Sequence, residues 1–365
     1  MNKLVFANLL HRPLRSIISV LAVAIEVIMM LTIIAIMLGQ LTGQKRLNNG
    51  IGADLIVRPP NTAFFNGIGG APISAKLAPV LGALPHVTVS SPVITNLSVA
   101  NGLEVLWGID YPTYSRLGPF LFLAGGPFQK SDDVMVDDIF AGKTHHLGDT
   151  IPINGRPFHI CGIYEHGKGG RKLIQIQTMG QMLGDEGKAS VFYLKVDRPE
   201  NVALVTTEIL NVRGMANYQV MTMDEWMSLM TPDRIPALNT AMDVVIGIAV
   251  VIGFLVIFQA MYTSVLERTR EIGILKALGA SQLTIVTVVL RETAVLSVAG
   301  VAVGVAASFA TKSLLGQRFP TLYLDMSSAL VAKGAAIALL GSLFGAVYPA
   351  WMAARKDPID ALAYE

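Results

Sequence analysis

Four long apolar runs constrain the fold of this 365-residue chain more than any other feature. The first covers residues 16–41, and the other three lie near the C-terminus, at residues 242–266, 283–311 and 328–352. A helix over the first run would extend roughly 39 Å, enough to cross a hydrocarbon core of about 30 Å with some tilt. Each run is therefore predicted to be a transmembrane helix, in a plan of one helix, a long intervening segment and three helices.

The composition supports a membrane protein and argues against two other classes. Apolar residues make up 52% of the chain and charged residues 15%, and the mean hydropathy is +0.54. Soluble domains have about 25% charged residues, so a purely soluble enzyme is not expected. The 28 Lys and Arg against 26 Asp and Glu leave a net charge of +2, which argues against a nucleic-acid-binding protein. The single cysteine, Cys161, can form no disulfide within the chain.

The first apolar run has a second interpretation as a secretory signal peptide. Lys3, Arg12 and Arg15 precede it, as they would precede a signal sequence. The run is longer than an h-region of about 7–15 residues, and no small-residue cleavage site closes it. We therefore expect this helix to remain in the mature protein.

Basic residues predict the orientation of the spans, because loops rich in Lys and Arg stay in the cytoplasm. They predict a multi-pass plasma (inner) membrane protein with both termini and residues 267–282 in the cytoplasm and residues 42–239 outside it. A domain of that length crosses the membrane largely regardless of its charge, so Lys45 and Arg46 do not change the prediction. The basic residues that set the orientation are Lys3, Arg12, Arg15, Arg268, Arg270, Lys276, Arg355 and Lys356.

The segment between the first and second spans has the mixed composition of a water-soluble α+β domain. Its β-branched stretches predict strands, with turns at Asn101-Gly102 and Asn154-Gly155. The expected strands are at residues 53–59, 86–110, 150–165 and 190–196, and the expected helices at residues 73–84, 131–141 and 199–210. Residues 59–72 form a loop with Phe64 and Phe65, which either packs on its own core or offers a contact surface.

Two segments of this domain come close to a phosphate-binding loop. Residues 162–169 read GIYEHGKG, with Gly169 where a Ser or Thr would bind magnesium. Residues 137–144 contain Thr144 but have Asp137 in place of the first glycine. Both lie in the predicted outer domain, away from cytoplasmic ATP. We expect no nucleotide hydrolysis and no catalytic residue on this chain.

Four histidines and the cysteine lie fairly close in sequence in the same domain. Imidazole and thiolate groups would suit zinc or copper, but none of the spacings is that of a recurrent metal motif. Solvent-facing side chains are therefore favoured over a metal site. The residues are His145, His146, His159, Cys161 and His166.

Glu26 is the most unusual residue of the spans, because a charge inside the bilayer is costly and usually faces a partner or a cavity. Met29 and Met30 follow it at offsets of three and four, near the same helical face. A carboxylate and thioethers could bind a cation or haem, for which methionine is a known axial ligand. The favoured alternative is that Glu26 meets a polar group of a neighbouring helix while the methionines fill gaps.

Small residues in the last two spans predict close helix packing. Residues 300–304 and 341–345 carry GXXXG patterns, which let helix backbones approach each other. Ser281 is expected to cap the third span in water, so that Arg291 and Glu292 lie near its cytoplasmic start.

Two C-terminal segments resemble the signature of MacB/FtsX-like ABC transporter permeases. They are ERTREIGILKALGASQLTIVTVVLRETAVLSVAG at residues 267–300 and FGAVYPAWMAARKDPIDALAYE at residues 344–365. The N-terminal NLLHRPLRS and the plan of one span, an outer domain and three spans are similar too. In size the chain is nearest to the DevC-like and HrtB-like subtypes.

The resemblance implies three regions and a set of partners. Residues 1–41 would be the N-terminal segment and first span, residues 42–239 the outer domain, and residues 240–365 the FtsX-like permease domain. The permease would form a homodimer that binds two copies of a separate cytoplasmic ABC ATPase, which would hold ATP-Mg. Residues 267–282 would be the coupling loop. Its charged face would comprise Glu267, Arg268, Arg270, Glu271 and Lys276, while Ile272, Ile274 and Leu275 would pack into a groove on the ATPase.

The implied function is mechanical coupling of ATP hydrolysis to export of a hydrophobic or amphiphilic substrate. Haem is one candidate substrate, and membrane lipid and a membrane-fusion adaptor are implied partners. The alternative is an FtsX-like signalling permease that does not transport and instead switches an extracytoplasmic enzyme.

Overall fold

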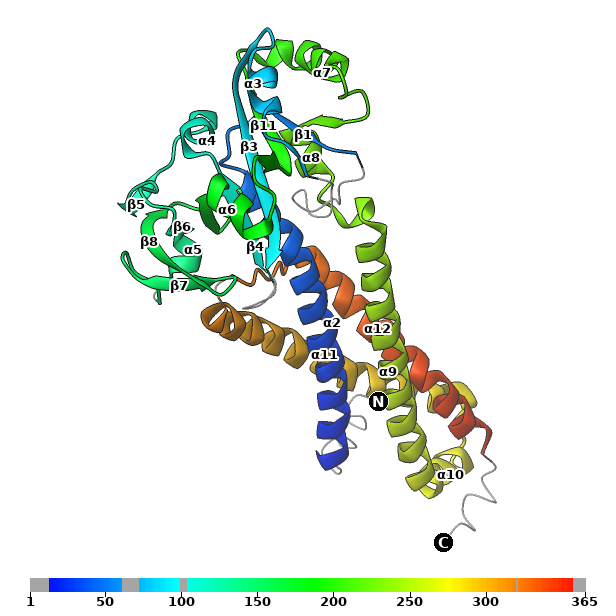
Figure 1. The fold of residues 1–365 in the computed structure, drawn as a ribbon. Coiled ribbons are helices and arrows are strands. Elements are labelled where there is room, and N and C mark those ends of the chain that lie inside the picture. The colour runs from blue at the N-terminus through cyan, green and yellow to red at the C-terminus, as the bar shows by residue number, and fades with distance from the viewer. Residues whose placement is uncertain (1–12, 61–71, 99–103, 143, 320, 357–365) are drawn as a thin grey trace. The chain divides into compact units, whose positions relative to one another are not determined.

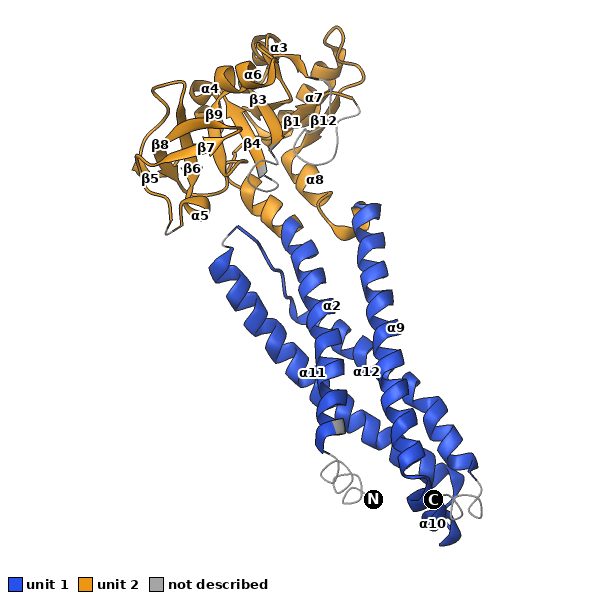
Figure 2. Cartoon of the chain, turned by 60° about the horizontal axis from the view of Figure 1, so that its bottom comes forward, with its two compact units in different colours: residues 1–40, 235–365 blue, residues 41–234 orange. Residues whose placement is uncertain are grey.

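The computed structural model describes residues 13–60, 72–98, 104–142, 144–319 and 321–356, and it divides into two compact units. Unit 1 comprises residues 1–40 and 235–365, and unit 2 comprises residues 41–234 (Figure 2). The division lies close to the expected limits of the outer domain, residues 42–239.

Unit 1 is a helical bundle. Among the described residues, four helices are long and apolar enough to cross a membrane, as predicted. They are α2 (Pro13–Asn48), α9 (Pro236–Glu267), α11 (Gln282–Arg318) and α12 (Ser328–Arg355) (Figure 1). The short helix α10 (Thr269–Ala277) lies between α9 and α11 in the chain. Ser281 caps α11 by accepting a hydrogen bond from the Thr284 N–H, which confirms the predicted start of that helix.

Glycines allow the helices of unit 1 to approach closely. A Cβ atom on Gly300 or Gly304 of α11 would lie 2.6 or 2.8 Å from the Cβ atoms of Val23 and Val27 on α2. A Cβ on Gly345 of α12 would lie 2.8 Å from the Phe254 carbonyl oxygen of α9. Any larger residue would push these helices apart, so both glycines of the first GXXXG pattern and Gly345 of the second allow close packing, as expected. At Gly341 the nearest atom would lie 3.9 Å from an added Cβ, which is an ordinary contact.

Unit 2 is built on a mixed 10-stranded sheet with strand order β12-β1-β11-β3-β4-β9-β6-β8-β5, in which β7 pairs with β8. A separate small sheet joins β2 and β10. The strands are β1 (Leu55–Arg58), β2 (Ile73–Ser74), β3 (Val87–Ser98), β4 (Glu104–Ile109), β5 (Phe122–Gly125), β6 (Asp133–Asp137), β7 (Thr150–Ile153), β8 (Arg156–Tyr164), β9 (Lys172–Gln175), β10 (Lys188–Ala189), β11 (Val191–Val196) and β12 (Gln219–Thr222).

Short helices accompany this sheet and enclose its apolar core, which includes the fully buried Trp107 and Trp226. They are α3 (Leu77–Gly82), α4 (Tyr111–Leu117), α5 (Asp138–Ala141), α6 (Ile176–Leu183), α7 (Val202–Asn211) and α8 (Met223–Ser228), with 3₁₀ turns η1 (Pro199–Asn201) and η2 (Pro232–Arg234).

All four expected strand segments of unit 2 are confirmed. β1, β3 with β4, β7 with β8, and β11 fall within the four predicted segments. Asn154 and Gly155 take φ values of 47° and 77° in the turn between β7 and β8, a conformation that suits Asn-Gly. The Asn101-Gly102 turn and the loop residues Phe64 and Phe65 lie outside the described residues. The helix expected at residues 199–210 is present as η1 and α7.

Two of the expected helices are partly wrong. Residues 131–141 contain strand β6, and only α5 at their end is helical. All five β6 residues are buried between β8 and β9, so sheet pairing outweighs the local pattern. Residues 73–84 likewise begin as strand β2, and α3 covers only their second half.

Candidate functional site

The chain between the second and third spans breaks at one residue. Arg268 ends α9 and precedes α10, with φ −108° and ψ 15°. The Thr269 hydroxyl donates to the carbonyl oxygens of Val265 and Leu266, at 3.2 and 2.8 Å. These bonds add to the one that the Arg268 N–H donates to the Val265 carbonyl oxygen at 3.3 Å, and together they close the end of α9.

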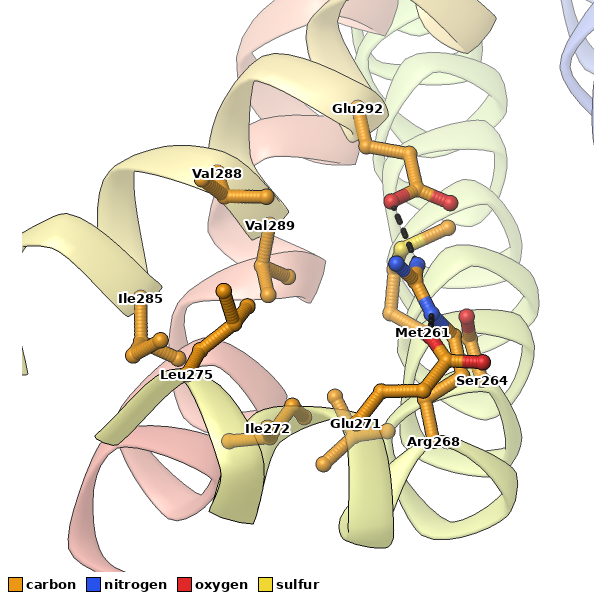
Figure 3. A pocket seen from close by; sticks show the side chains of 11 residues that line it. Met261, Ser264, Arg268, Glu271, Ile272, Leu275, Ile285, Val288, Val289 and Glu292 are labelled. Atoms are coloured by element: carbon orange, nitrogen blue, oxygen red, sulfur yellow. Dashed lines mark hydrogen bonds and ion pairs between the residues drawn. The ribbon is translucent and has the colours of Figure 1, made fainter. Parts of the chain in front are cut away.

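Arg268 ties this break to the neighbouring helix α11. Its Nη1 atom lies 2.9 Å from Oε2 of Glu292, and its Nε atom lies 3.0 Å from Oε2 of Glu271 (Figure 3). The side chains of Arg268 and Glu292 are only 16% and 10% exposed, whereas Glu271 is 60% exposed. The Arg268–Glu292 pair is therefore the more buried of the two, and removal of either partner would leave a charge without compensation.

Apolar side chains fill the other side of this site (Figure 3). Ile272 and Leu275 of α10 pack with Ile285 of α11 and with Ala353 and Ala354 of α12. The cavity left between α9, α10 and α11 has a volume of about 30 Å³. That volume suits one or two water molecules and is far below the size of a ligand pocket. The site is thus a brace between helices and not a substrate pocket.

A second brace joins α10 to the end of α12. The Lys276 ammonium group donates to the carbonyl oxygens of Ala354 and Lys356, at 2.9 and 2.5 Å. A cation at the C-terminus of a helix is favourable because it compensates the carbonyl end of the helix dipole. The Arg268–Glu292 ion pair therefore holds the start of α10 to α11, and the hydrogen bonds of Lys276 hold its end to α12.

The remaining side of α10 is not covered by any of the residues that the structure describes. Arg270, Ile274 and Leu278 follow at intervals of four residues, which puts them on one helical face. All three are exposed, Leu278 by 80%. We call these three residues the outward α10 face. Leu283, two residues after the cap of α11, is similarly exposed.

The structure revises the expected coupling loop. Ile272 and Leu275 do not extend into an external groove, because they pack inside their own chain, and Arg268 and Lys276 act in the two braces. Of the eight predicted residues, Glu267, Arg270, Glu271 and Ile274 keep exposed side chains. The pairing of Arg268 with Glu292 and the exposure of Leu278 were not predicted. The sequence signal for the pair was the glutamate at the start of an apolar run, which needs a cation nearby.

The second set of candidates, in the first span, is not brought together. Glu26 and Met30 are buried, with 4% and 1% exposure, whereas Met29 is 44% exposed. The Glu26 carboxyl group lies against Gly253 of α9, and no polar group of the described residues bonds to it. The expected polar neighbour of Glu26 is therefore not found among the described residues. Haem binding by these three residues stays a prediction, and their arrangement does not favour it.

Four of the five histidines of unit 2 lie near separate aspartates, whereas the His145 ring stacks on Phe140. Nδ1 of His166 lies 3.1 Å from Asp138, and Nε2 of His159 lies 3.8 Å from Asp132. Within the part of the chain that the structure describes, no three His, Cys, Asp or Glu side chains gather in a way that could hold a metal ion. Burial raises the pKa of the Cys161 thiol to about 12, so the group stays protonated.

The loop that approaches a phosphate-binding pattern has a structural role. The Lys168 ammonium group donates to the Gly50 carbonyl and, at 3.1 Å, to the Gly118 carbonyl. The Gly50 N–H donates to the Gly167 carbonyl at 2.8 Å. The lysine of GIYEHGKG therefore fastens the residues that follow α2 to the body of unit 2, and burial lowers its pKa.

Four apolar helices, a domain inserted between the first and the second, and a braced helix between the second and the third define a multi-pass membrane protein of the permease type. The profile of the MacB-like periplasmic core domain matches residues 16–212, and that of the FtsX-like permease C-terminal domain matches residues 244–358. The chain belongs to the MacB/FtsX-like family of ABC transporter permeases.

Three relatives illustrate the range of this family. An uncharacterized ABC transporter permease, YvrN of Bacillus subtilis (strain 168), is 26% identical over 99% of this chain and 98% of its own length. The permease YknZ of the same organism is 31% identical over 67% of this chain and 63% of its length. The macrolide export ATP-binding/permease protein MacB of Hahella chejuensis is 25% identical over 100% of this chain. This chain spans only 60% of that protein.

Proposed function

We propose that this chain is the permease subunit of an ABC-type exporter and that a separate cytoplasmic ABC ATPase docks on the outward α10 face. The observation that carries the proposal is that α10 is braced on its inner side while Arg270, Ile274 and Leu278 stay exposed. A surface made of one cation and two large apolar side chains is more typical of a protein–protein contact than of a face exposed to water. ATP-Mg would be bound by the ATPase, and this chain would have no catalytic residue.

The two braces connect α10 to two of the membrane spans, so a movement of α10 would be transmitted to them. A push on α10 would reach α11 through Arg268–Glu292 and α12 through Lys276. α2 is one continuous helix whose last turns belong to unit 2, and α9 begins directly after unit 2. Rigid-body motion of these two helices would therefore act on the outer domain. The proposed work is mechanical, with both chain termini in the cytoplasm and unit 2 outside it.

An apolar stripe on α2 supports contact with lipid and with a second permease. Its side chains recur every three or four residues and are 44–73% exposed. Such a stripe is too large to face water. We assign it to membrane lipid and to the interface of a permease homodimer. The residues are Leu14, Ile17, Ile18, Leu21, Ile25 and Met29.

The proposed substrate is a hydrophobic or amphiphilic molecule taken from the outer leaflet or the outer domain. The site among α9, α10 and α11 is too small to pass it, and this favours a mechanism in which the outer domain moves. A membrane-fusion adaptor on the outer domain would complete an exporter. The alternative is an FtsX-like signalling permease, and the FtsX-like C-terminal match fits both.

Docking is tested by replacing a cation and an apolar side chain of the outward α10 face with acidic side chains. The double variant Arg270→Glu/Leu278→Asp is compared with Leu204→Asp, a change at a 49% exposed leucine of α7 in unit 2. Both proteins should insert in the membrane, because neither change touches a buried contact. Co-purification of the ATPase and stimulation of its activity should fall at least tenfold in the first variant only. Undiminished co-purification with the double variant would refute docking at this face.

Transport and signalling are separated by a second experiment with the same complex in liposomes. An exporter should move a fluorescent amphiphile out of the leaflet when ATP is added. A signalling permease should hydrolyse ATP without moving the amphiphile and should instead retain an extracytoplasmic hydrolase during purification.

A further inference from the structure

Two glutamates are buried among the described residues of unit 1, and of these Glu292 alone has a charged partner there. Glu292 is 8% exposed and pairs with Arg268. Glu26 is 4% exposed, and neither of its carboxyl oxygens has a hydrogen-bond partner among the described residues. A buried polar group without a partner is rare in folded proteins and needs its own explanation.

The position of the Glu26 carboxyl group is set by a missing side chain on α9. A Cβ atom built on Gly253 would overlap Cδ and both oxygens of Glu26. The carboxyl group thus occupies the notch that this glycine leaves in α9. Met30, one helical turn further along α2, is buried as well, at 1% exposure. Glu26 is therefore enclosed between α2 and α9 and does not face lipid.

On the helices that pack against α2, most titratable side chains lie far along the helix axis from Glu26. Gly253 is ten residues from Asp243 and nine from Tyr262 on α9, or about 14–15 Å along the helix. Gly300 and Gly304 of α11 meet Val23 and Val27, and Gly334 of α12 meets Met30 and Leu31. None of these titratable groups bonds to Glu26. The nearest along each helix are Asp243 and Tyr262 on α9, Glu292 and Lys312 on α11, and the exposed Lys333 and Tyr348 on α12.

A carboxylate anion cannot be accommodated in this environment at low cost. An isolated ion in an apolar medium is far less favourable than the neutral acid, which loses only the hydration of a polar group. We infer that Glu26 is a proton-binding site in the first span, held as a neutral carboxylic acid while its side chain fills the Gly253 notch. When α2 and α9 separate and water enters, the acid releases its proton, and the proton returns as the helices close.

This inference deepens the proposed function, because α2 and α9 are the two helices that would carry motion to the outer domain. Each closing of the helices would take up one proton at Glu26 and each opening would release one. The closed arrangement would then be favoured by a proton and disfavoured by a negative charge. The ligand of the site is the proton itself, so no external cofactor is required.

Infrared spectroscopy of the purified full chain in lipid nanodiscs tests the protonation state directly. At about pH 8, above the pKa of about 6 that burial gives to Asp137 in unit 2, a protonated carboxyl should still give a C=O stretching band. The band should be present in wild type and in Glu292→Gln, and absent in Glu26→Gln. No protonated-carboxyl band in the wild-type protein would overturn the inference, as would a band that survives in Glu26→Gln.

A second variant tests the link between protonation and helix packing. Gly253→Ala keeps Glu26 but fills the notch, so it should force the carboxyl group into a wetter position and remove the band at about pH 8. An unchanged band in a folded Gly253→Ala protein would contradict the role of the notch. The spectra are recorded without an ATPase. A negative docking experiment therefore does not contradict the Glu26 inference, and a negative infrared result does not contradict docking on α10.

Discussion

Glu292 and Glu26 are the same residue type in the same helical bundle, yet the fold treats them in opposite ways. Glu292 lies where α9 breaks, and Arg268 extends across to it at 2.9 Å. Glu26 lies ten residues into the predicted first span, where the facing helix offers only a glycine. The first carboxyl group is paired with a cation, and the second is enclosed without a hydrogen-bond partner among the described residues. A buried carboxyl group can therefore either hold two helices together through an ion pair or change its charge when the packing around it changes.

The largest effect should come from removal of the Arg268 side chain. Arg268→Leu leaves Glu292 buried without its cation and should destabilise unit 1 by about 3–5 kcal/mol. Arg270→Leu, at the exposed residue two positions later, is the matched control and should change stability by less than about 0.5 kcal/mol. Unfolding of the two variants in mixed micelles would measure the difference. Equal stability of the two would show that the Arg268–Glu292 pair is not a brace.

Asp137 in unit 2 extends the comparison to a third buried carboxyl. Burial raises its pKa to about 6, although the nearby Arg171 and the hydrogen bond from the Phe140 N–H act in the opposite direction. A carboxyl whose folded pKa is raised stabilises the fold below its unfolded pKa, and this contribution is lost as pH rises through about 6.

Asp137→Asn cannot ionise, so its stability relative to wild type should rise between about pH 4 and about pH 6. The gain should be on the order of 3 kcal/mol, on top of a constant loss from the weaker Arg171 contact. The buried Trp107 and Trp226 report unfolding of unit 2 by fluorescence in the full chain. A stability difference that does not change with pH would argue that Asp137 titrates normally.

Gly253→Ala should have an intermediate effect on the stability of unit 1. The added methyl group would overlap the Glu26 carboxyl, and such overpacking costs about 1–3 kcal/mol. Gly247→Ala on the same helix is the control, because no atom lies within 4 Å of the position of its added Cβ. Thermal unfolding in detergent should separate the two. If both variants are equally stable, the Glu26 carboxyl group leaves the notch without cost, and close packing there does not stabilise unit 1.

The smallest effect is expected for Glu26→Gln. Glutamine resembles the neutral acid in size and polarity, so the loss of stability should be smaller than for the other variants of unit 1 at buried contacts. Glu292→Gln removes the charge that pairs with Arg268 and should be clearly less stable. If Glu26→Gln proved the more damaging of the two, Glu26 would need to be charged in the native state.

Local sequence patterns were enough for the features that depend on short-range chemistry. Apolar length predicted the four spans, the hydroxyl of Ser281 predicted the start of α11, and Asn154-Gly155 predicted a hairpin. The GXXXG glycines predicted close packing, because a glycine has no side chain to keep a neighbouring helix away, whichever helix that is.

The features that depend on distant residues were not predictable in the same way. Residues 131–141 read as a helix, and only pairing with β8 and β9 makes β6 a strand. The partner of Arg268 is 24 residues away along the chain, and the notch that encloses Glu26 is more than two hundred residues away. For the same reason, Ile272 was expected to face a partner protein and instead packs against α12 of its own chain.

The proposed function requires that the outward α10 face be cytoplasmic and available to an ATPase while unit 2 lies outside the cytoplasm. Single cysteines at Leu278 and Leu204, in a Cys161→Ser background, would report this in intact cells through a membrane-impermeant maleimide. We expect Leu204→Cys to be labelled at once, and Leu278→Cys only after the membrane is opened and only when the ATPase is absent. Labelling of Leu278→Cys from outside intact cells would contradict the proposed orientation of the permease.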